Sequence, residues 1–281
     1  MCSSSLKGTL YIVATPIGNL KDITLRAIET LKSTDIIAAE DTRRTKELLS
    51  VLGIKGKKLI SCHEHNEKET AEKILNYLKE GLSVSLVSDA GTPTISDPGY
   101  KVVKEVREKG FNVIPVPGAS AVIAALSASG FPTDKFLFYG FLPKKRKKRQ
   151  EALKEILYMP WTVVVYESPH RIEETLKEIA MLMPDKKLGI YREITKLYEE
   201  FLEGTAEELL EKVKPKGEFV LLFYPFKENK KEENIGELLL SFRKEGLSLK
   251  EAVKKTCEIT GRKKNEIYRE ALKIYKEGEN P

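Results

Sequence analysis

The sequence has few cysteines, histidines and tryptophans and no long apolar run. Its 281 residues include one tryptophan, three histidines and three cysteines, Cys2, Cys62 and Cys257. The cysteines are far apart and fit neither a disulfide framework nor a zinc site, which is typical of a reducing compartment. No apolar run approaches the roughly 18 residues that a membrane span needs, and residues 1–16 show no signal peptide. We therefore expect a cytoplasmic protein that does not bind a membrane.

Two common nucleotide-binding motifs are also absent from the sequence. It has no Walker pattern, which argues against a nucleoside-triphosphate site, and no G-x-G-x-x-G, which argues against an ordinary dinucleotide-binding fold. His63 and His65 follow Cys62, but a metal would need carboxylate ligands in a matching geometry. We predict no metal site and favour hydrogen bonding of these histidines to RNA or to a neighbouring loop.

The sequence has a mild excess of basic residues, and six of them are consecutive. The formal net charge is +6, from 48 basic and 42 acidic residues, which permits a polyanionic partner but serves solubility equally well. Six consecutive basic residues precede a helical pattern, namely Lys144, Lys145, Arg146, Lys147, Lys148 and Arg149. Positive charge at a helix start is unfavourable with the helix dipole. We therefore favour phosphate binding over a solvated helix end for this basic run.

Short β-branched runs alternate with amphipathic stretches along most of the chain. Nine strands are predicted, at 9–14, 35–39, 58–61, 83–87, 112–116, 136–139, 162–166, 188–191 and 218–223. Helical patterns lie between most of them, at 69–79, 100–109, 119–129, 149–157 and 171–181. This alternation predicts an α/β fold with a mostly parallel sheet. Because nine strands are many for one sheet and 115–120 (PVPGAS) is a natural hinge, we predict two α/β domains, at 8–117 and 118–228.

The end of the chain has a different character. The polar tract 227–234 is typical of a linker, and residues 235–281 predict about three short helices. Ser248 and Glu251 have the spacing of a capping box, and Gly246 and Gly261 mark breaks. This small helical appendage resembles a helix-turn-helix in outline. A helical tail that docks on the body or on a dimer partner is an open alternative.

Unusual residues concentrate directly after the predicted strands. Seven such segments carry Gly, Pro, Asp, Arg or His, at 15–20, 40–45, 62–66, 88–99, 117–120, 167–171 and 192–196. In open α/β sheets, ligands bind beyond the carboxyl ends of the strands. Glycines in the longest segment, 88–99, let the backbone approach a ligand closely. Each segment alone has the composition of an ordinary turn, but together they predict one functional cleft.

Six motifs in order resemble one known family. They are VATPIGNL (13–20), AEDTR (39–43), SDAGTPTISDPG (88–99), GFLP (140–143), YESPHR (166–171) and REITK (192–196). This series resembles the ribosomal RNA small subunit methyltransferase I family, within the tetrapyrrole methylase-like superfamily, over about residues 8–225. The resemblance implies two α/β domains with S-adenosylmethionine in the cleft between them, and usually a homodimer. It also implies 2′-O-methylation of a cytidine in the decoding region of 16S rRNA, in the small ribosomal subunit.

The resemblance further implies a set of site residues. Those expected to bind the cofactor are Pro16, Asp89, Thr92, Ile95, Ser120, Ala121, Tyr166 and Val220. From their charge rather than from the resemblance, we expect the basic run 144–149 with Arg43, Arg44, Arg171 and Arg192 to bind RNA.

Methyl transfer from a sulfonium to a sugar hydroxyl requires alignment and no metal. Holding the two reactants in line can supply about 7–11 kcal/mol, and a proton acceptor adds to this. Our candidates for that acceptor are Glu167 and Glu193, with Lys196 and nearby arginines orienting phosphate or lowering the hydroxyl pKa. The alternative is that Glu167 with Arg171, and Arg192 with Glu193, form structural ion pairs.

Two other functions stay open at this point. One is a tetrapyrrole (porphyrinoid) C-methyltransferase of the same superfamily. The basic run 144–149 and the Lys and Arg residues of the helical appendage 235–281 argue against it. The other is a non-catalytic RNA-binding protein, against which the complete 88–99 segment argues.

We expect Glu193→Gln to lower turnover and to leave affinity for S-adenosylmethionine intact, because the carboxylate is predicted to act on the acceptor. Methyl transfer and calorimetric cofactor binding test this together. Unchanged turnover would remove Glu193 from the mechanism.

Overall fold

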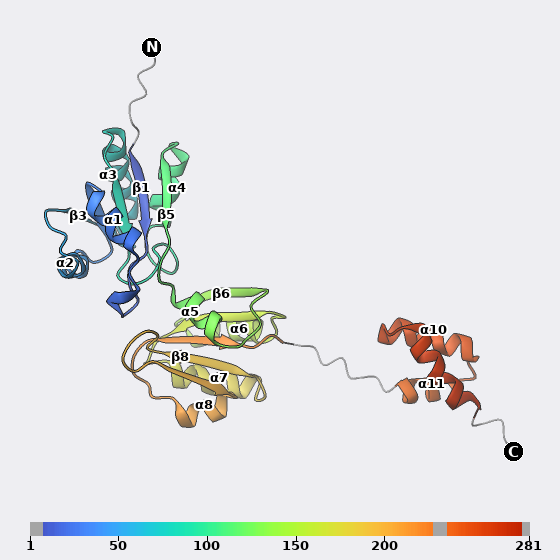
Figure 1. The fold of residues 1–281 in the computed structure, drawn as a ribbon. Coiled ribbons are helices and arrows are strands. Elements are labelled where there is room, and N and C mark those ends of the chain that lie inside the picture. Colours follow the sequence, from blue (N-terminus) through green and yellow to red (C-terminus); the bar gives the residue numbers. More distant parts are fainter. Residues whose placement is uncertain (1–7, 227–234, 277–281) are drawn as a thin grey trace, which may run out of the picture. The chain divides into compact units, whose positions relative to one another are not determined.

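The computed structural model describes residues 8–226 and 235–276, which belong to two separate units. The first unit ends at Phe226 and contains two β-sheets with helices on their faces, and the second is helical (Figure 1). No helix in these described ranges is long and apolar enough to cross a membrane. The predicted linker at 227–234, Cys2 and the last five residues lie outside them.

The first sheet is entirely parallel, in the order β3-β2-β4-β1-β5. Helices α3 and α4 pack on one face and α1 and α2 on the other. Strands β2 and β4 are buried along their whole length, as expected for the inner strands of a parallel sheet covered on both faces. The elements are β1 (Thr9–Val13), a 3-10 helix η1 (Leu20–Asp22), α1 (Leu25–Ser33), β2 (Ile36–Ala39), α2 (Thr42–Val51), β3 (Lys58–Ser61), α3 (Glu67–Lys79), β4 (Val84–Val87), α4 (Tyr100–Glu108) and β5 (Asn112–Val116).

The second sheet is mixed, in the order β6-β7-β10-β8-β9. Strands β6 and β7 are parallel, whereas β10 is antiparallel to both β7 and β8, and β8 is antiparallel to β9. Helices α6, α7 and α8 cover one face, and α5 packs on the other. The elements are α5 (Ala121–Ala128), β6 (Phe136–Phe141), α6 (Arg146–Leu157), β7 (Thr162–Glu167), α7 (Ile172–Leu182), β8 (Leu188–Arg192), β9 (Glu200–Gly204), α8 (Ala206–Lys212) and β10 (Phe219–Phe223).

The α/β class is confirmed, but the prediction of a mostly parallel sheet is wrong for the second sheet. The described residues also contain β9, a tenth strand that the sequence pattern does not predict, and the helices α1, α2 and α8. Strand β9 (EFLEG) carries two glutamates and pairs on one side only, with β8. Charged side chains on an edge strand are common, and they weaken the apolar pattern by which a strand is recognised.

The two sheets correspond to the two halves of the predicted α/β region. The first occupies 9–116, the second occupies 136–223, and α5 packs on the second. Both sheets belong to one compact unit. The boundary at 117/118 therefore stays a prediction.

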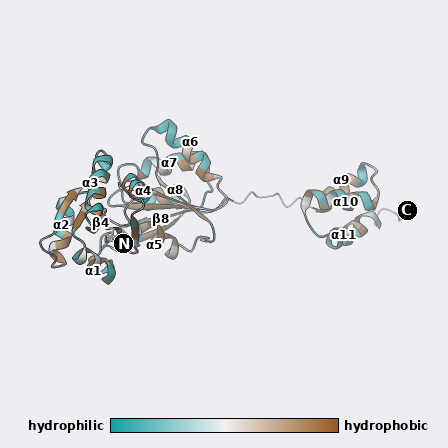
Figure 2. Ribbon diagram, turned by 90° about the horizontal axis from the view of Figure 1, so that it is seen from above, coloured by the Kyte–Doolittle hydropathy of each residue, from teal (hydrophilic) through white to brown (hydrophobic). Residues whose placement is uncertain are grey.

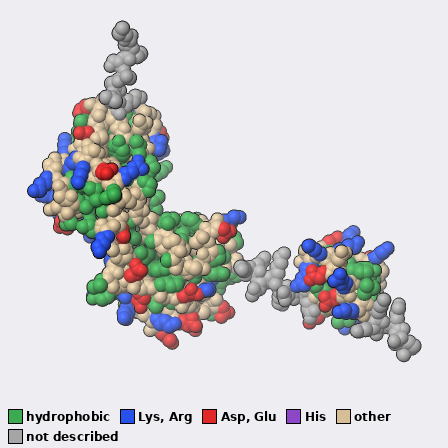
Figure 3. Space-filling view, in the orientation of Figure 1, with side chains coloured by type: hydrophobic (Ala, Val, Ile, Leu, Met, Phe, Trp, Pro, Cys, Tyr) green, Lys and Arg blue, Asp and Glu red, His purple; other side chains and the backbone are tan. Residues whose placement is uncertain are grey.

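The helical unit contains α9 (Ile235–Lys244), α10 (Leu249–Thr260) and α11 (Lys264–Lys276). All three contribute to its apolar core, which includes Leu239, Val253 and Ile267. The capping box at Ser248 is confirmed, and Gly261 ends α10 in the left-handed region at φ 66°. Lys and Arg side chains are interspersed with acidic ones on the face of this unit that Figure 3 shows.

The basic run divides between surface and core at the start of α6. The side chains from Lys144 to Lys148 are exposed, and α6 is coloured as largely hydrophilic in Figure 2. Arg149 is 2% exposed, and its Nε and Nη2 donate to the two carboxylate oxygens of Glu178 at 2.8 and 3.0 Å. Its Nη2 also lies 2.7 Å from Glu174. The prediction that Arg149 binds RNA is therefore wrong, because its position on the inward face of α6 commits its guanidinium to α7.

We expect Arg149→Met to lower the free energy of unfolding by about 3–5 kcal/mol, because Glu178 is then buried without its main cation. The control Lys148→Met changes the same charge at an exposed neighbour and should stay within about 0.5 kcal/mol of wild type. Urea unfolding of the full chain, followed by circular dichroism, measures both. Wild-type stability in Arg149→Met would show that the ion pair does not hold α6 on α7.

Candidate functional site

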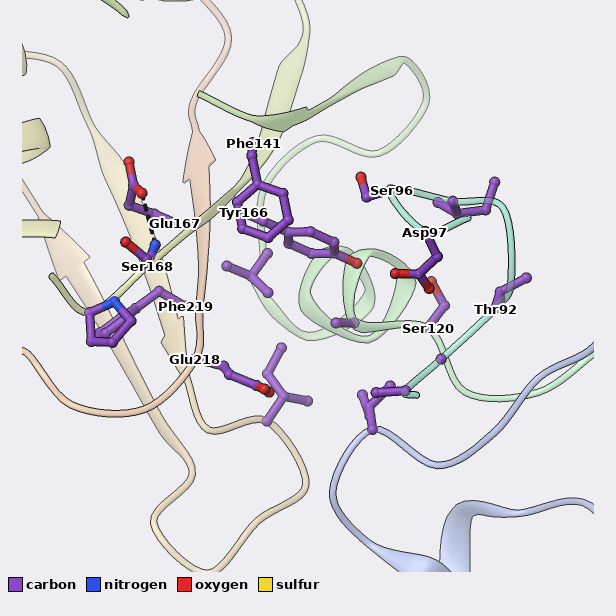
Figure 4. A pocket seen from close by; sticks show the side chains of 18 residues that line it. Thr92, Ser96, Asp97, Ser120, Phe141, Tyr166, Glu167, Ser168, Glu218 and Phe219 are labelled. Carbon is purple, nitrogen blue, oxygen red and sulfur yellow. Dashed lines mark hydrogen bonds between the residues drawn. The ribbon is translucent and has the colours of Figure 1, made fainter. Parts of the chain in front are cut away.

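A cavity of about 320 Å³ lies where loops from both sheets of the first unit meet. Its volume is within the range of small-molecule sites. Ile17 follows β1, Ala90 to Asp97 follow β4, Tyr166 ends β7, and Val220 lies in β10. The side chains that face this space are drawn in Figure 4. Six of the eight predicted cofactor-binding residues line it, namely Thr92, Ile95, Ser120, Ala121, Tyr166 and Val220.

The loop 88–99 is held in an unusual backbone conformation. Thr94 and Ser96 have φ values of 74° and 62°, in the left-handed region that non-glycine residues rarely adopt. Backbone hydrogen bonds in both directions join Thr15 to Gly91, at 2.9 and 3.0 Å. The Thr92 hydroxyl donates to the Ala119 carbonyl at 3.2 Å. Such strained residues cost on the order of 1–3 kcal/mol each and cluster at binding sites.

Asp97 is a residue of this cavity that the sequence does not single out. Burial, with Glu40 and Asp89 nearby, raises the pKa of its carboxyl to about 6, although a hydrogen bond from Ser88 opposes the shift. Burial and the Asp97 charge in turn raise the pKa of Tyr166 to about 12. Asp97 and Tyr166 extend toward the same space in Figure 4. The cavity therefore holds a neutral phenol beside a carboxyl that titrates close to neutral pH.

Aromatic and aliphatic side chains form the other walls. The Tyr166 ring contacts the rings of Phe138 and Phe141 edge-on, at centroid distances of 4.9 and 5.4 Å. Ile17 and Ile194 come from loops of the two different sheets. These walls suit a flat apolar ring, and the Ser96, Asp97 and Ser120 side chains lie across the cavity from Phe141 (Figure 4).

A second cavity of about 310 Å³ adjoins the first, and Ile17, Ala90 and Glu218 line both. Pro16 and Asp89 line the second cavity and not the first, and their assignment to the cofactor stays a prediction. Asp89 accepts a hydrogen bond from the Asp41 amide at 3.0 Å and lies 3.3 Å from Arg44. These contacts turn its carboxylate toward α2.

Glu167 lines the first cavity but is occupied by structural contacts. Its carboxylate is buried and lies 2.7 Å from Arg171. It also accepts hydrogen bonds from the Ser168 amide and the Thr175 hydroxyl, both at 2.8 Å. Arg171 additionally donates to the Leu142 carbonyl. The structural ion pair is thus the alternative that the structure favours, and we withdraw Glu167 as a proton acceptor and Arg171 as an RNA contact.

Lys196 lines the second cavity and is fixed by two carboxylates. Its Nζ lies 2.9 Å from Glu193 and 2.9 Å from Glu218, and Glu193 also accepts from the Glu218 amide. Burial favours a higher pKa for Glu193, but the hydrogen bonds from Lys196 and Glu218 outweigh it and lower the pKa. Burial likewise favours a lower pKa for Lys196, and the two carboxylates outweigh it and raise the pKa. Glu193 lines neither cavity and is a charged support for Lys196 rather than a poised base.

The remaining predicted arginines differ in their surroundings. Arg192 donates to Glu200, on the unpredicted strand β9, at 3.0 Å, so it forms its ion pair there and not with Glu193, as the structural alternative had it. The Arg192 side chain is 12% exposed, which also argues against RNA binding by this residue. Arg43 and Arg44 are 88% and 69% exposed, beside Asp41 and Asp89. Their assignment to RNA stays a prediction.

The His63 and His65 rings lie 6.0 Å apart. Within the described residues, no three His, Cys, Asp or Glu side chains are grouped so that they could hold a metal ion.

Comparison with known families and structures identifies the class of this fold. Residues 9–210 match the family model of Tetrapyrrole (Corrin/Porphyrin) Methylases, and residues 233–274 match that of the RsmI C-terminal HTH domain. A structure of uroporphyrin-III C-methyl transferase from Thermus thermophilus, in complex with S-adenosyl homocysteine, has a TM-score of 0.54 at 20% identity. It covers 77% of this chain and 97% of its own. Diphthine synthase has a TM-score of 0.60 at 16% identity, over 78% of this chain and 90% of its own. The first unit thus has the tetrapyrrole methylase fold.

More similar relatives define the family within this class. The protein named ribosomal RNA small subunit methyltransferase I of Neisseria meningitidis (serogroup A) is 46% identical over 280 residues, 96% of this chain and 94% of the relative. Its namesake in Bacillus subtilis is 43% identical over 272 residues, 93% of each chain. That of Escherichia coli O157:H7 is 46% identical over 273 residues, 95% of each chain. The chain belongs to the ribosomal RNA small subunit methyltransferase I family, which confirms the resemblance found in its motifs.

We expect Asp97→Asn to stabilise the protein at pH 8. The carboxyl has a pKa of about 6 in the folded chain, above its ordinary value of 3.8, so its ionisation at higher pH disfavours the folded state. Removing that charge should raise the free energy of unfolding by about 1 kcal/mol at pH 8, once the shift is discounted for partial exposure, and by little at pH 4. Urea unfolding at both values of pH measures this.

Asp35→Asn is the matched control, because hydrogen bonds from Ser83 lower the pKa of Asp35. This variant should lose stability at pH 8. A loss of stability at pH 8 in Asp97→Asn as well would contradict the assignment of a raised pKa.

Proposed function

We propose that this protein transfers a methyl group from S-adenosylmethionine to the ribose 2′-hydroxyl of a cytidine in the decoding region of 16S rRNA. Relatives named ribosomal RNA small subunit methyltransferase I, at 43–46% identity over nearly the whole chain, support the reaction and the RNA class. The observation that carries the proposal is the first cavity, in which predicted cofactor-binding residues from both sheets line one space. By the same family membership, we propose a cytoplasmic homodimer.

The residues of the first cavity fit S-adenosylmethionine. Tyr166 and Phe141 offer aromatic surface for an adenine ring, beside Ile95 and Val220. Ser96, Ser120 and Asp97 offer hydroxyl and carboxyl groups for the polar parts of the cofactor. The Asp97 charge and the aromatic faces also suit a cation, since both attract positive charge. When bound, the cofactor supplies an electrophilic methyl group on a sulfonium.

The chain contributes mainly by positioning the acceptor. With S-adenosylmethionine bound, its methyl group would pass from sulfur to the ribose oxygen and the hydroxyl proton would pass to water, which would leave S-adenosylhomocysteine and a 2′-O-methyl ribose. Of the three predicted catalytic side chains, Lys196 is the one that lines a cavity in which RNA can meet the cofactor. We retain Lys196 as the cation that orients the acceptor, with Glu193 holding its ammonium group. The loss of turnover expected for Glu193→Gln then acts through Lys196.

Exposed cations support the RNA partner. Lys144, Lys145, Arg146, Lys147 and Lys148 form a basic segment before and within the first turn of α6. Arg43 and Arg44 are exposed at the start of α2. Such groups bind phosphate through charge and counterion release. We propose that both sets contact the RNA backbone.

We expect Ala121→Trp to abolish cofactor binding and methyl transfer, because an indole at this position fills the first cavity. Calorimetry with S-adenosylmethionine should show an affinity loss of at least about 100-fold, and 30S subunits should no longer accept methyl groups from the radiolabelled cofactor. The control Ile123→Trp lies on the same helix, is 55% exposed and is outside the cavity; it should behave as wild type. Wild-type affinity in Ala121→Trp would place the cofactor elsewhere.

The wild-type protein distinguishes the other two functions in the same assays. Methyl transfer to uroporphyrinogen III, but not to 30S subunits, would favour the porphyrinoid methyltransferase suggested by the fold of its structural neighbours. Absence of binding heat at high cofactor concentration would favour a non-catalytic RNA-binding protein.

A further inference from the structure

The proposed cofactor site accounts for the first cavity but not for the second. It has nearly the same volume, about 310 Å³ against about 320 Å³, and opens beside it, with Ile17, Ala90 and Glu218 as shared walls. None of the six predicted cofactor-binding residues that line the first cavity lines the second. The two spaces therefore form adjoining compartments with different walls.

The walls of the second cavity combine opposite charges with an apolar side. Arg44 and Lys196 supply positive charge, and Asp89 and Glu218 supply negative charge. Leu48 contributes apolar surface from α2. A nucleotide has the matching chemistry, because its phosphate pairs with cations, its base presents a flat face to apolar groups, and the amino group of cytosine donates to carboxylates.

The two cations come from the two halves of the first unit. Arg44 belongs to α2 of the first sheet, and Lys196 to the loop after β8 of the second. The Lys196 stem lies so close to Gly18 that a Cβ there would be 2.6 Å from its Cγ and Cε. The Thr195 hydroxyl donates a short hydrogen bond to Asp22 in the same region. These contacts hold the Lys196 stem against the loop that follows β1.

We propose that the second cavity binds the acceptor nucleotide of a single-stranded RNA, with its phosphate at the exposed Arg44 and its ribose at the Ala90 edge, beside Lys196. At that edge the two cavities meet, so a sugar hydroxyl there faces the compartment that holds the methyl donor. The inference rests on the proposed function, because it requires methyl donor and RNA acceptor to occupy neighbouring compartments. It adds a location for the acceptor and the side chains that position it.

Filling the cavity tests the proposal. Leu48→Trp places an indole in the acceptor space, and Val51→Trp, on the same helix but 68% exposed and outside both cavities, is the matched control. We expect Leu48→Trp to bind S-adenosylmethionine within about twofold of wild type, as measured by calorimetry. Its kcat/KM for 30S subunits should fall about 100-fold, since a displaced acceptor loses its alignment. Val51→Trp should match wild type in both assays.

A surface substitution tests the charges without filling the cavity. Arg44→Gln should raise KM for 30S subunits about tenfold, because one phosphate contact is lost, and should leave cofactor affinity intact. Lys46→Gln removes the same charge from an exposed position on the same helix, outside the cavity, and should leave KM unchanged.

Three results would overturn the inference. Weaker cofactor binding in Leu48→Trp would show that the second cavity holds part of the cofactor. Wild-type kcat/KM in that variant would show that the acceptor lies elsewhere. Equal effects of Arg44→Gln and Lys46→Gln would reduce the role of Arg44 to general surface charge.

An RNA-binding measurement separates this inference from the proposed function. A fluorescein-labelled, cytidine-containing single-stranded RNA is titrated with each full-length variant, and fluorescence anisotropy gives its affinity. If wild type binds this RNA but does not methylate 30S subunits, the proposed function fails. The inferred site then stands if Leu48→Trp loses affinity for the RNA and Val51→Trp does not. It fails if both of these variants lose affinity or if neither does.

Discussion

The backbone bridge between Thr15 and Gly91 is the constraint on which both cavities depend. It joins the loops that follow β1 and β4, which are neighbouring parallel strands of the first sheet. Gly91 has φ 81°, and a Cβ on it would lie 3.3 Å from the Ile17 side chain. The bridge therefore requires a residue that is small and tolerates positive φ, which glycine satisfies. Ile17 and Ala90, on either side of the bridge, are walls shared by the two cavities.

The antiparallel strand β10 brings the second sheet to the same place. Val220 pairs with Tyr166 of β7 and with Tyr191 of β8. Because β10 runs against both neighbours, its first residues lie beside the last residues of β7 and β8. Glu218 and Val220 therefore reach the site from the start of a strand, whereas Tyr166 and Ile194 reach it from strand ends. In the first sheet, where all strands are parallel, only the carboxyl ends contribute.

This difference explains how much of the site the sequence predicts. The polar and glycine-rich segments after the strands predict a cleft, and the family resemblance assigns Thr92, Ser120 and Tyr166 to it. Glu218 has no such signal, since it precedes its strand in a segment rich in lysine. Asp97 lies inside a recognised motif, but its raised pKa depends on burial and on Glu40, which is distant in sequence. The fold class follows from alternation of strands and helices, whereas the direction of β10 and the edge strand β9 depend on pairings that alternation does not encode.

The roles of the basic residues also cannot be predicted fully from the sequence. Their neighbours in the fold determine which of them form structural ion pairs and which are free to bind RNA. Arg149 and Arg192 resemble Lys148 and Arg43 in sequence, as cations within charged segments near the ends of strands or helices. The first two lie against Glu178 on α7 and Glu200 on β9, and their side chains are mostly withdrawn from solvent, which leaves little charge for a phosphate. Lys148 and Arg43 are exposed, and an exposed cation keeps both its hydration and its access to RNA.

Periodicity along α6 could have separated Arg149 from its neighbours, because it lies three, four and seven residues before the buried Ala152, Leu153 and Ile156, on the inward face of an amphipathic helix. A cation on such a face requires a buried carboxylate, and that requirement identifies it as part of the core before its partner is known.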